Sequence, residues 1–255
     1  MRVKTQTATL AVLGELGRIP LTAKLHIRLL SYWARLISLP ESNLLKISYN
    51  MLLDLHLLGT KTWCSQIINT LKYYNLQHLW ENKDKDQIKK FNFKKHIQTF
   101  HQNSIKKDIQ DSNILPKLRT YKLFKTDMNP EKYLLISIPK YRISLTQFRT
   151  SSHCLEIERG RYHKPKIPAN QRFCKYCDLH EIDDEIHFLL NCNHNLKLRL
   201  ELFRYIQPLM PNIDIEHLKL AKPIELFIFL MTIENLSVLT AIGKFISQSF
   251  TNRNL

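Results

Sequence analysis

The segment FCKYCDLHEIDDEIHFLLNC, residues 173–192, concentrates side chains that bind metal ions. Cys174 and Cys177 form a C-x2-C pair, whose tight turn lets two thiolates reach one ion. His187 and Cys192 form a second pair. The whole pattern, C-x2-C-x9-H-x4-C, supplies four ligands, the number that zinc takes in closed structural sites. Because no position is left for water, the pattern predicts Zn²⁺ as a structural cofactor without a catalytic residue.

Two other histidines are possible substitutes for His187. His180 would leave a long loop before Cys192, and His194 would crowd that cysteine, so His187 fits best. The acids of the EIDDE stretch can be read as a catalytic carboxylate set. We favour the simpler interpretation that they lie at the positive end of a helix, since no second carboxylate cluster stands out as their partner.

We expect the second ligand pair to lie on a short helix that Asp183 can cap. His187 and Cys192 are five residues apart, which is about 140° around an ideal helix. Both can therefore reach one ion only if the helix ends or bends near Asn191, and we predict that it ends there.

The net charge of +16 is unevenly distributed over the 255 residues. Residues 83–149 contain sixteen Lys and Arg against six Asp and Glu, whereas residues 1–82 carry +5 and residues 150–255 carry +1. Such a basic block suggests a nucleic-acid partner first and an anionic membrane surface second, with a solvated basic face as the alternative. Aromatic residues are interleaved with the basic ones; exposed aromatics stack on bases, but we expect most of these to face the core.

The composition describes a globular chain, with 44% hydrophobic residues and only five glycines. Neither glycine-rich phosphate-binding motif is present. Five cysteines, without a convincing signal peptide, indicate an intracellular protein that lacks structural disulfides and lies in the nucleus or cytoplasm. No apolar run is long enough to span a bilayer, so no membrane partner is expected.

Hydrophobic periodicity predicts a mainly α fold. Leu25, Leu29, Tyr32 and Leu36 form an apolar stripe in the first clear helix, residues 21–39. Cys64 lies beside the apolar face of a later helix and is read as a packed thiol. In the last forty residues, Gly243 is expected to interrupt the final helix.

We divide the chain into four segments by charge and composition. They are an N-terminal helical region (1–82), a basic helical nucleic-acid-binding region (83–158), a basic linker with the CCHC zinc module (159–195), and a C-terminal helical cap (196–255).

The stretch RISLTQFRTSSHCLEIERGRYHKPKIPANQRFCKYCDLHEIDDEIHFLLNC resembles the region downstream of the polymerase in LINE-type, non-long-terminal-repeat retrotransposon reverse transcriptases. Those proteins often carry LRxSxHxLxIExGR, then RxCxxC, then an acidic EDExHFLxxC. The N-terminal GELGRIPL and YWARL are similar to the linker that follows the polymerase. The matching residues in the main stretch are Phe148, Arg149, Ser151, His153, Leu155, Ile157, Glu158, Gly160, Arg161, Arg172, Cys174, Cys177, Asp184, Glu185, His187, Phe188, Leu189 and Cys192.

The resemblance implies RNA or DNA binding during target-primed reverse transcription, beside a polymerase encoded elsewhere. The chain lacks the Tyr/Phe-x-Asp-Asp turn of such polymerases, and nothing after Cys192 matches their nuclease. We therefore expect a non-catalytic, zinc-stabilised fragment that holds template RNA or target DNA. The expected phosphate contacts are Arg149, Arg159, Arg161, Lys164, Lys166, Arg172 and Lys175.

Three other interpretations stay open. The zinc and helices can form a docking surface for a protein partner, in which case binding would not depend on salt. A zinc hydrolase or nuclease would need an open coordination position. The chain can also be a decayed copy without function.

Overall fold

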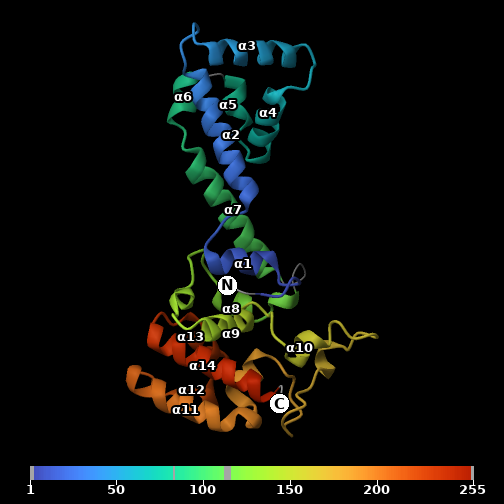
Figure 1. The fold of residues 1–255 in the computed structure, drawn as a ribbon, viewed down its shortest axis with the longest axis vertical. Helices are drawn as coiled ribbons and strands as arrows, with labels where there is room; N and C mark the ends of the chain where they lie inside the picture. Colours follow the sequence, from blue (N-terminus) through green and yellow to red (C-terminus); the bar gives the residue numbers. More distant parts are fainter. Residues whose placement is uncertain (1–2, 83, 112–115, 254–255) are drawn as a thin grey trace. The chain divides into compact units, whose positions relative to one another are not determined.

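The computed structural model describes residues 3–82, 84–111 and 116–253 (Figure 1). The fold is mainly α, as predicted. Within these ranges no β-strand is present beyond one isolated antiparallel bridge between Phe173 and Ile182. The chain forms two compact units: unit 1 comprises Met1–Arg18 and Lys106–Leu255, and unit 2 comprises Ile19–Ile105. These limits differ from the four predicted segments, because the N-terminal residues belong with unit 1 and the basic segment is divided between the units.

Unit 2 is a group of helices around an apolar core that includes Leu30, Trp33, Ile67, Leu71 and Tyr74. Cys64 is fully buried in this core, which confirms the interpretation as a packed thiol. The helices are α2 (Leu21–Ile37), α3 (Leu44–Leu57), α4 (Trp63–Tyr73), α5 (Gln77–Asn82), α6 (Lys85–Lys90) and α7 (Phe93–Gln110), the last of which continues into unit 1.

The predicted apolar stripe of α2 is partly correct. Leu36 is buried and Leu29 packs against the core, but Leu25 and Tyr32 are exposed. The core side of the helix also carries Leu30, Trp33 and Ile37. The sequence carries apolar residues on more than one side of this helix, and only the neighbouring helices decide which side is buried.

Unit 1 contains the remaining helices. Its longest, α14, packs along α9 and against α11. The helices are α1 (Thr9–Leu16), α8 (Tyr121–Phe124), α9 (Pro139–Arg149), α10 (Glu156–Arg159), α11 (Leu196–Ile206), α12 (Ile215–Ala221), α13 (Pro223–Thr232) and α14 (Leu236–Arg253). In the described part of the chain no single helix has the length and apolarity to cross a membrane; α13 and α14 meet these criteria only as a pair bent by 115°.

Gly243 does not interrupt the last helix, contrary to the prediction, because α14 runs through it without a break. A Cβ atom at this position would lie 2.9 Å from the carbonyl oxygen of Tyr141 in α9. The glycine is therefore required by the close approach of α9 and α14, which outweighs its intrinsic cost within a helix.

An ion cluster centred on Arg149 lies inside unit 1. The guanidinium is 2% exposed, and its Nε and one terminal nitrogen donate to the two carboxylate oxygens of Glu15 at 2.9 and 3.1 Å. It also pairs with Glu131 at 2.7 Å and donates to the carbonyl oxygen of Met231. These bonds connect α1, α9 and α13, so Arg149 serves the core of the unit.

Candidate metal centre

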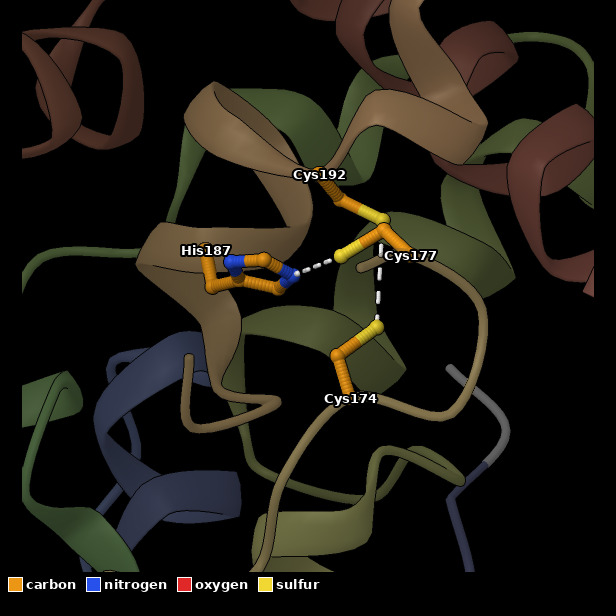
Figure 2. A group of neighbouring side chains, drawn as sticks. All are labelled: Cys174, Cys177, His187 and Cys192. Atoms are coloured by element: carbon orange, nitrogen blue, oxygen red, sulfur yellow. Dashed lines mark hydrogen bonds between the residues drawn. The ribbon is translucent and has the colours of Figure 1, made fainter. Parts of the chain in front are cut away.

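Four potential ligand atoms converge in unit 1 (Figure 2). The Sγ atoms of Cys174, Cys177 and Cys192 and a ring nitrogen of His187 all lie within 4.8 Å of one another. Cys174 Sγ is 3.9 Å from Cys192 Sγ, and Cys177 Sγ is 3.4 Å from His187 Nε2. This cluster can hold a metal ion. It contains the predicted ligands, and the histidine in it is His187 rather than either substitute.

A short hairpin positions the first two cysteines. The bridge between Phe173 and Ile182 is flanked by two backbone hydrogen bonds. Cys174 N–H donates to the Glu181 carbonyl oxygen at 2.9 Å, and Asp183 N–H donates to the Arg172 carbonyl oxygen at 2.9 Å. The intervening residues form a closed loop that returns Cys177 toward the second ligand pair.

A single wide helical turn positions the second pair. His187–Asn191 form one π-helical turn, in which Cys192 N–H donates to the His187 carbonyl oxygen at 2.8 Å. The helix therefore ends at Asn191, as predicted. A π turn is wider than an α turn, and it brings residues five apart toward the same side. The N-terminal cap is Asp184, whose Oδ1 accepts from His187 N–H at 2.9 Å; the predicted cap, Asp183, instead accepts from Glu156 N–H and Arg253.

Glu181 orients the imidazole of His187. Its Oε2 lies 2.7 Å from His187 Nδ1 and also accepts from the Asn191 side chain at 3.1 Å. A carboxylate only accepts, so this bond keeps a proton on Nδ1 and directs Nε2 toward the cysteines. Burial opposes protonation of the ring, but hydrogen bonds to Cys192 and Glu181 outweigh it and raise the His187 pKa to about 9.

Arg253, near the end of α14, compensates the charge of the sulfur atoms. One terminal nitrogen lies 3.2 Å from Cys192 Sγ and 3.7 Å from Cys174 Sγ, and the other donates to Asp183 at 2.8 Å. The hydrogen bond from Cys174 lowers the pKa of Cys192, against the effect of burial and with help from His187 and Arg253. The same hydrogen bond and burial raise the pKa of Cys174. The arrangement favours a thiolate beside the guanidinium.

A second polar network, centred on Glu185, supports the helical turn. Glu185 is 1% exposed and accepts from Ser151 at 3.1 Å, lies 2.9 Å from His153 Nε2, and pairs with Arg119. Burial alone would raise the pKa of Glu185. Arg119, and to a lesser degree His153, outweigh this effect and lower the pKa to about 2. Arg119 also binds Glu158 at 3.1 Å. The network thereby joins the metal-binding segment to residues before and within α10.

The predicted phosphate-binding residues divide into two groups. Arg149 and Arg172 are buried, and Arg172 donates to the carbonyl oxygens of Ile157 and Ile167, so the structure does not present either guanidinium at the surface. Arg161 is partly buried and pairs with Glu158 at 3.0 Å. The exposed members are Arg159, Lys164, Lys166 and Lys175, of which the first and last pair with Glu156.

Sequence reasoning missed several residues of this region. Glu181 and Arg253 contact the ligands, yet one resembles any surface acid and the other lies sixty residues away in sequence. Tyr162 and Phe173 are exposed, at 57% and 46%, in the basic loop of residues 159–175.

Most aromatic residues of the basic middle segment, by contrast, face the core, as expected. The buried ones are Phe93, Tyr121, Phe124, Tyr133 and Phe148.

The donor set determines what the centre can do. With four protein ligands around one position, no coordination site is left for water or substrate, which is the arrangement of structural metal sites. Comparison with family models, curated proteins and solved structures finds no match for this chain.

Proposed function

We propose that this chain is a zinc-stabilised nucleic-acid-binding part of a LINE-type retrotransposon reverse transcriptase. It holds template RNA or target DNA for a polymerase encoded elsewhere and has no polymerase or nuclease site of its own. The observation that carries the proposal is a closed Cys3His cluster next to a loop, residues 159–175. The exposed basic and aromatic side chains of this loop are Arg159, Tyr162, Lys164, Lys166, Phe173 and Lys175. Figure 1 shows this loop, in yellow, extending beyond α10.

The spacing of the ligand atoms supports zinc as the metal. Zinc binds sulfur at about 2.3 Å and imidazole nitrogen at about 2.0–2.1 Å in a tetrahedron. The edges of such a tetrahedron are about 3.8 Å between two sulfurs and about 3.6 Å between sulfur and nitrogen. The distances of 3.9 Å for Cys174–Cys192 and 3.4 Å for Cys177–His187 agree with these edges.

The charge at the centre also suits a divalent ion. Three thiolates and a neutral imidazole around Zn²⁺ leave a net charge of −1, and the buried Arg253 places a positive charge directly beside the sulfur atoms. Asp183 pairs with Arg253 and holds it in place, so the three groups together carry a charge of −1. Such outer contacts orient the ligands and reduce the cost of burying the charged centre.

The loop offers the two kinds of contact that single-stranded nucleic acid uses. Lys164 and Lys166 are exposed, and neither forms an ion pair with a carboxylate in the part of the chain that the structure describes, so they are available for phosphates. Tyr162 and Phe173 present aromatic faces on which bases stack. The metal centre fixes the backbone at the C-terminal end of this loop, where Cys174 follows Phe173 directly.

The test is binding of single-stranded RNA and DNA to the zinc-loaded chain, measured by fluorescence anisotropy over a salt series. About five phosphate contacts give a slope of log K against log salt near −3.5, at roughly −0.7 per phosphate. Lys164→Ala/Lys166→Ala should flatten the slope by about 1.4. Lys197→Ala/Lys222→Ala removes the same charge elsewhere in unit 1 and should leave it unchanged. An equal loss in both pairs would refute the role of the loop.

A zinc-supported protein-interaction module is the second candidate. The exposed apolar side chains of Leu179 and Leu196 near the centre favour it. It predicts a complex that is insensitive to salt, and no binding of RNA or DNA. Nucleotide incorporation by the purified chain on a primer–template would refute both candidates as stated.

A further inference from the structure

Helix α3 of unit 2 exposes an unusual amount of apolar surface. Seven large hydrophobic residues along it and at its C-terminal cap are 43–82% exposed. Figure 1 shows α3 lying across the end of the other helices of unit 2. The exposed residues are Leu44, Leu45, Ile47, Met51, Leu55, Leu57 and Leu58. Five of them, Leu44, Ile47, Met51, Leu55 and Leu58, share one side of the helix and form an apolar face, which marks an interaction site rather than ordinary surface.

The opposite face of α3 is fixed against the core, so the exposed face cannot simply turn inward. Tyr49 is buried and its hydroxyl accepts from Trp33 Nε1 at 3.1 Å. Lys46 is also buried, with its ammonium 5.3 Å from the centre of the Tyr49 ring. At the N-terminus, Asn43 accepts from Leu45 N–H at 3.0 Å, which sets where the helix begins.

The exposed residues are arranged symmetrically about Met51. When two copies of α3 pair in opposite directions around this residue, the exposed hydrophobic residues on the Met51 side meet one another. Leu44 faces Leu58, Ile47 faces Leu55, and Met51 faces itself. Leu45 and Leu57 lie about 120° from Met51 around the helix, outside this face. The central five, Leu44, Ile47, Met51, Leu55 and Leu58, follow the three- and four-residue spacing of packed helices. Two-fold interfaces require this self-complementarity, in which residue i contacts j and j contacts i.

Charge does not oppose the pairing. The chain has a net charge of +16, yet its one basic residue within α3 other than histidine, Lys46, is buried. The exposed acid Asp54 faces Ser48 in the antiparallel arrangement rather than another acid. The face is thus apolar and nearly uncharged in a strongly basic protein, whereas a nucleic-acid partner would require basic residues there.

We propose that the chain forms a two-fold homodimer through antiparallel packing of α3 against α3 of a second copy. A helix of 14 residues is about 21 Å long, so the interface lies at the small end of specific interfaces. Its affinity is expected to be on the order of micromolar. The proposal does not rest on the nucleic-acid function, since unit 2 contains no part of the metal centre.

Sedimentation equilibrium of the zinc-loaded full chain tests the dimer, from about 1 μM to about 100 μM. The apparent mass should rise from 30.3 kDa toward twice that value. Met51→Glu places two like charges on the two-fold axis and should weaken association by more than about 100-fold. Leu220→Glu, at another exposed hydrophobic residue in α12, should have no effect. A monomer over the whole range, or a dimer that Met51→Glu leaves intact, would overturn the proposal.

Paired substitutions test the antiparallel direction. Leu44→Glu/Leu58→Lys sets opposite charges against each other at both ends of the interface and should retain the dimer. Leu44→Glu/Leu58→Glu sets like charges there and should abolish it. Both variants alter the same exposed positions, and the thermal transition followed by tryptophan emission checks that unit 2 stays folded. Equal dimerisation of the two variants would overturn the antiparallel arrangement.

Discussion

Replacing Cys174 by serine removes one of four ligand atoms from the proposed zinc centre. A hydroxyl is a far poorer zinc ligand than a thiolate, so Cys174→Ser should lose the ion. The three remaining ligands, of which His187 and Cys192 are buried, would then lack the cation that draws them together. We expect residues 172–195 to lose their order and become sensitive to protease.

The size of this effect follows from the structure of the segment. Its regular backbone structure is one bridge, one short helical segment that ends in the π turn, and one 3-10 turn at Asn193–Asn195, which are too few to form a core of their own. Structural zinc contributes on the order of 10–16 kcal/mol to the folding of such peptides near neutral pH. A whole domain is stable by only about 5–15 kcal/mol. Loss of the ion therefore exceeds what the local contacts can replace, although the apolar core of unit 1 remains.

The positions of the tryptophans allow each unit to be followed separately. All three, Trp33, Trp63 and Trp80, lie in unit 2, so their emission reports on that unit. Cys174→Ser should abolish metal binding, measured by metal analysis or by cobalt absorption, and leave the tryptophan transition unchanged. Cys64→Ser should retain metal binding and lower the temperature of the tryptophan transition. It puts an unpaired hydroxyl into the core of unit 2, which costs about 1–3 kcal/mol of stability.

Cys154→Ser provides a further control, since this cysteine lies outside the ligand cluster. It should retain one zinc per chain. The reasoning fails if the wild-type protein binds no metal, or if Cys154→Ser loses it as completely as Cys174→Ser. A tryptophan transition that moves with metal removal would show that the two units do not unfold independently.

Three further substitutions test the supporting contacts. Glu181→Gln should weaken metal affinity by about 10–100-fold while keeping the fold, because it replaces the carboxylate that orients His187; competition with a metal chelator measures this. Arg149→Ala should destabilise unit 1 by about 3–5 kcal/mol, because it leaves buried carboxylates unpaired. Its control, Arg159→Ala at an exposed position, should change the stability by less than about 0.5 kcal/mol. Urea unfolding followed by circular dichroism compares the two variants. Gly243→Ala should destabilise unit 1 by about 1–3 kcal/mol in the same assay, because its Cβ forces α14 away from α9.

The clustering of Cys174, Cys177, His187 and Cys192 could be predicted from the sequence because thiolate and imidazole ligands have few other uses at this spacing. The end of the helix at Asn191 also followed, since the angle between His187 and Cys192 excluded a regular α-helix. The capping residue did not follow. Asp183 and Asp184 are adjacent and chemically equal, and the choice between them depends on Arg253, which arrives from the far end of unit 1.

The basic residues show the main limit of sequence reasoning. Arg149 and Lys164 are equally charged in the sequence, yet one is enclosed by Glu15 and Glu131 and the other is exposed. A composition count cannot separate them, because the acids that neutralise Arg149 come from distant segments. The net charge thus suggests nucleic acid as a class of partner, but only the packing shows which basic side chains are exposed.

The residues that carry the resemblance to retrotransposon proteins hold the metal-binding segment together. Ser151 and His153 contact Glu185, and Glu158 contacts Arg119, which contacts Glu185 as well. A side chain at Gly160 would collide with Arg172, whose guanidinium is buried.

In this chain these contacts hold the hairpin and the helical turn, whether or not nucleic acid binds. The residues that carry the resemblance therefore have a structural role. A function in nucleic-acid binding must instead be judged on exposed residues that the pattern leaves free, above all Tyr162, Lys164 and Lys166. For this reason the paired lysine substitutions are the decisive test of the proposed function, and substitutions at the pattern itself are not.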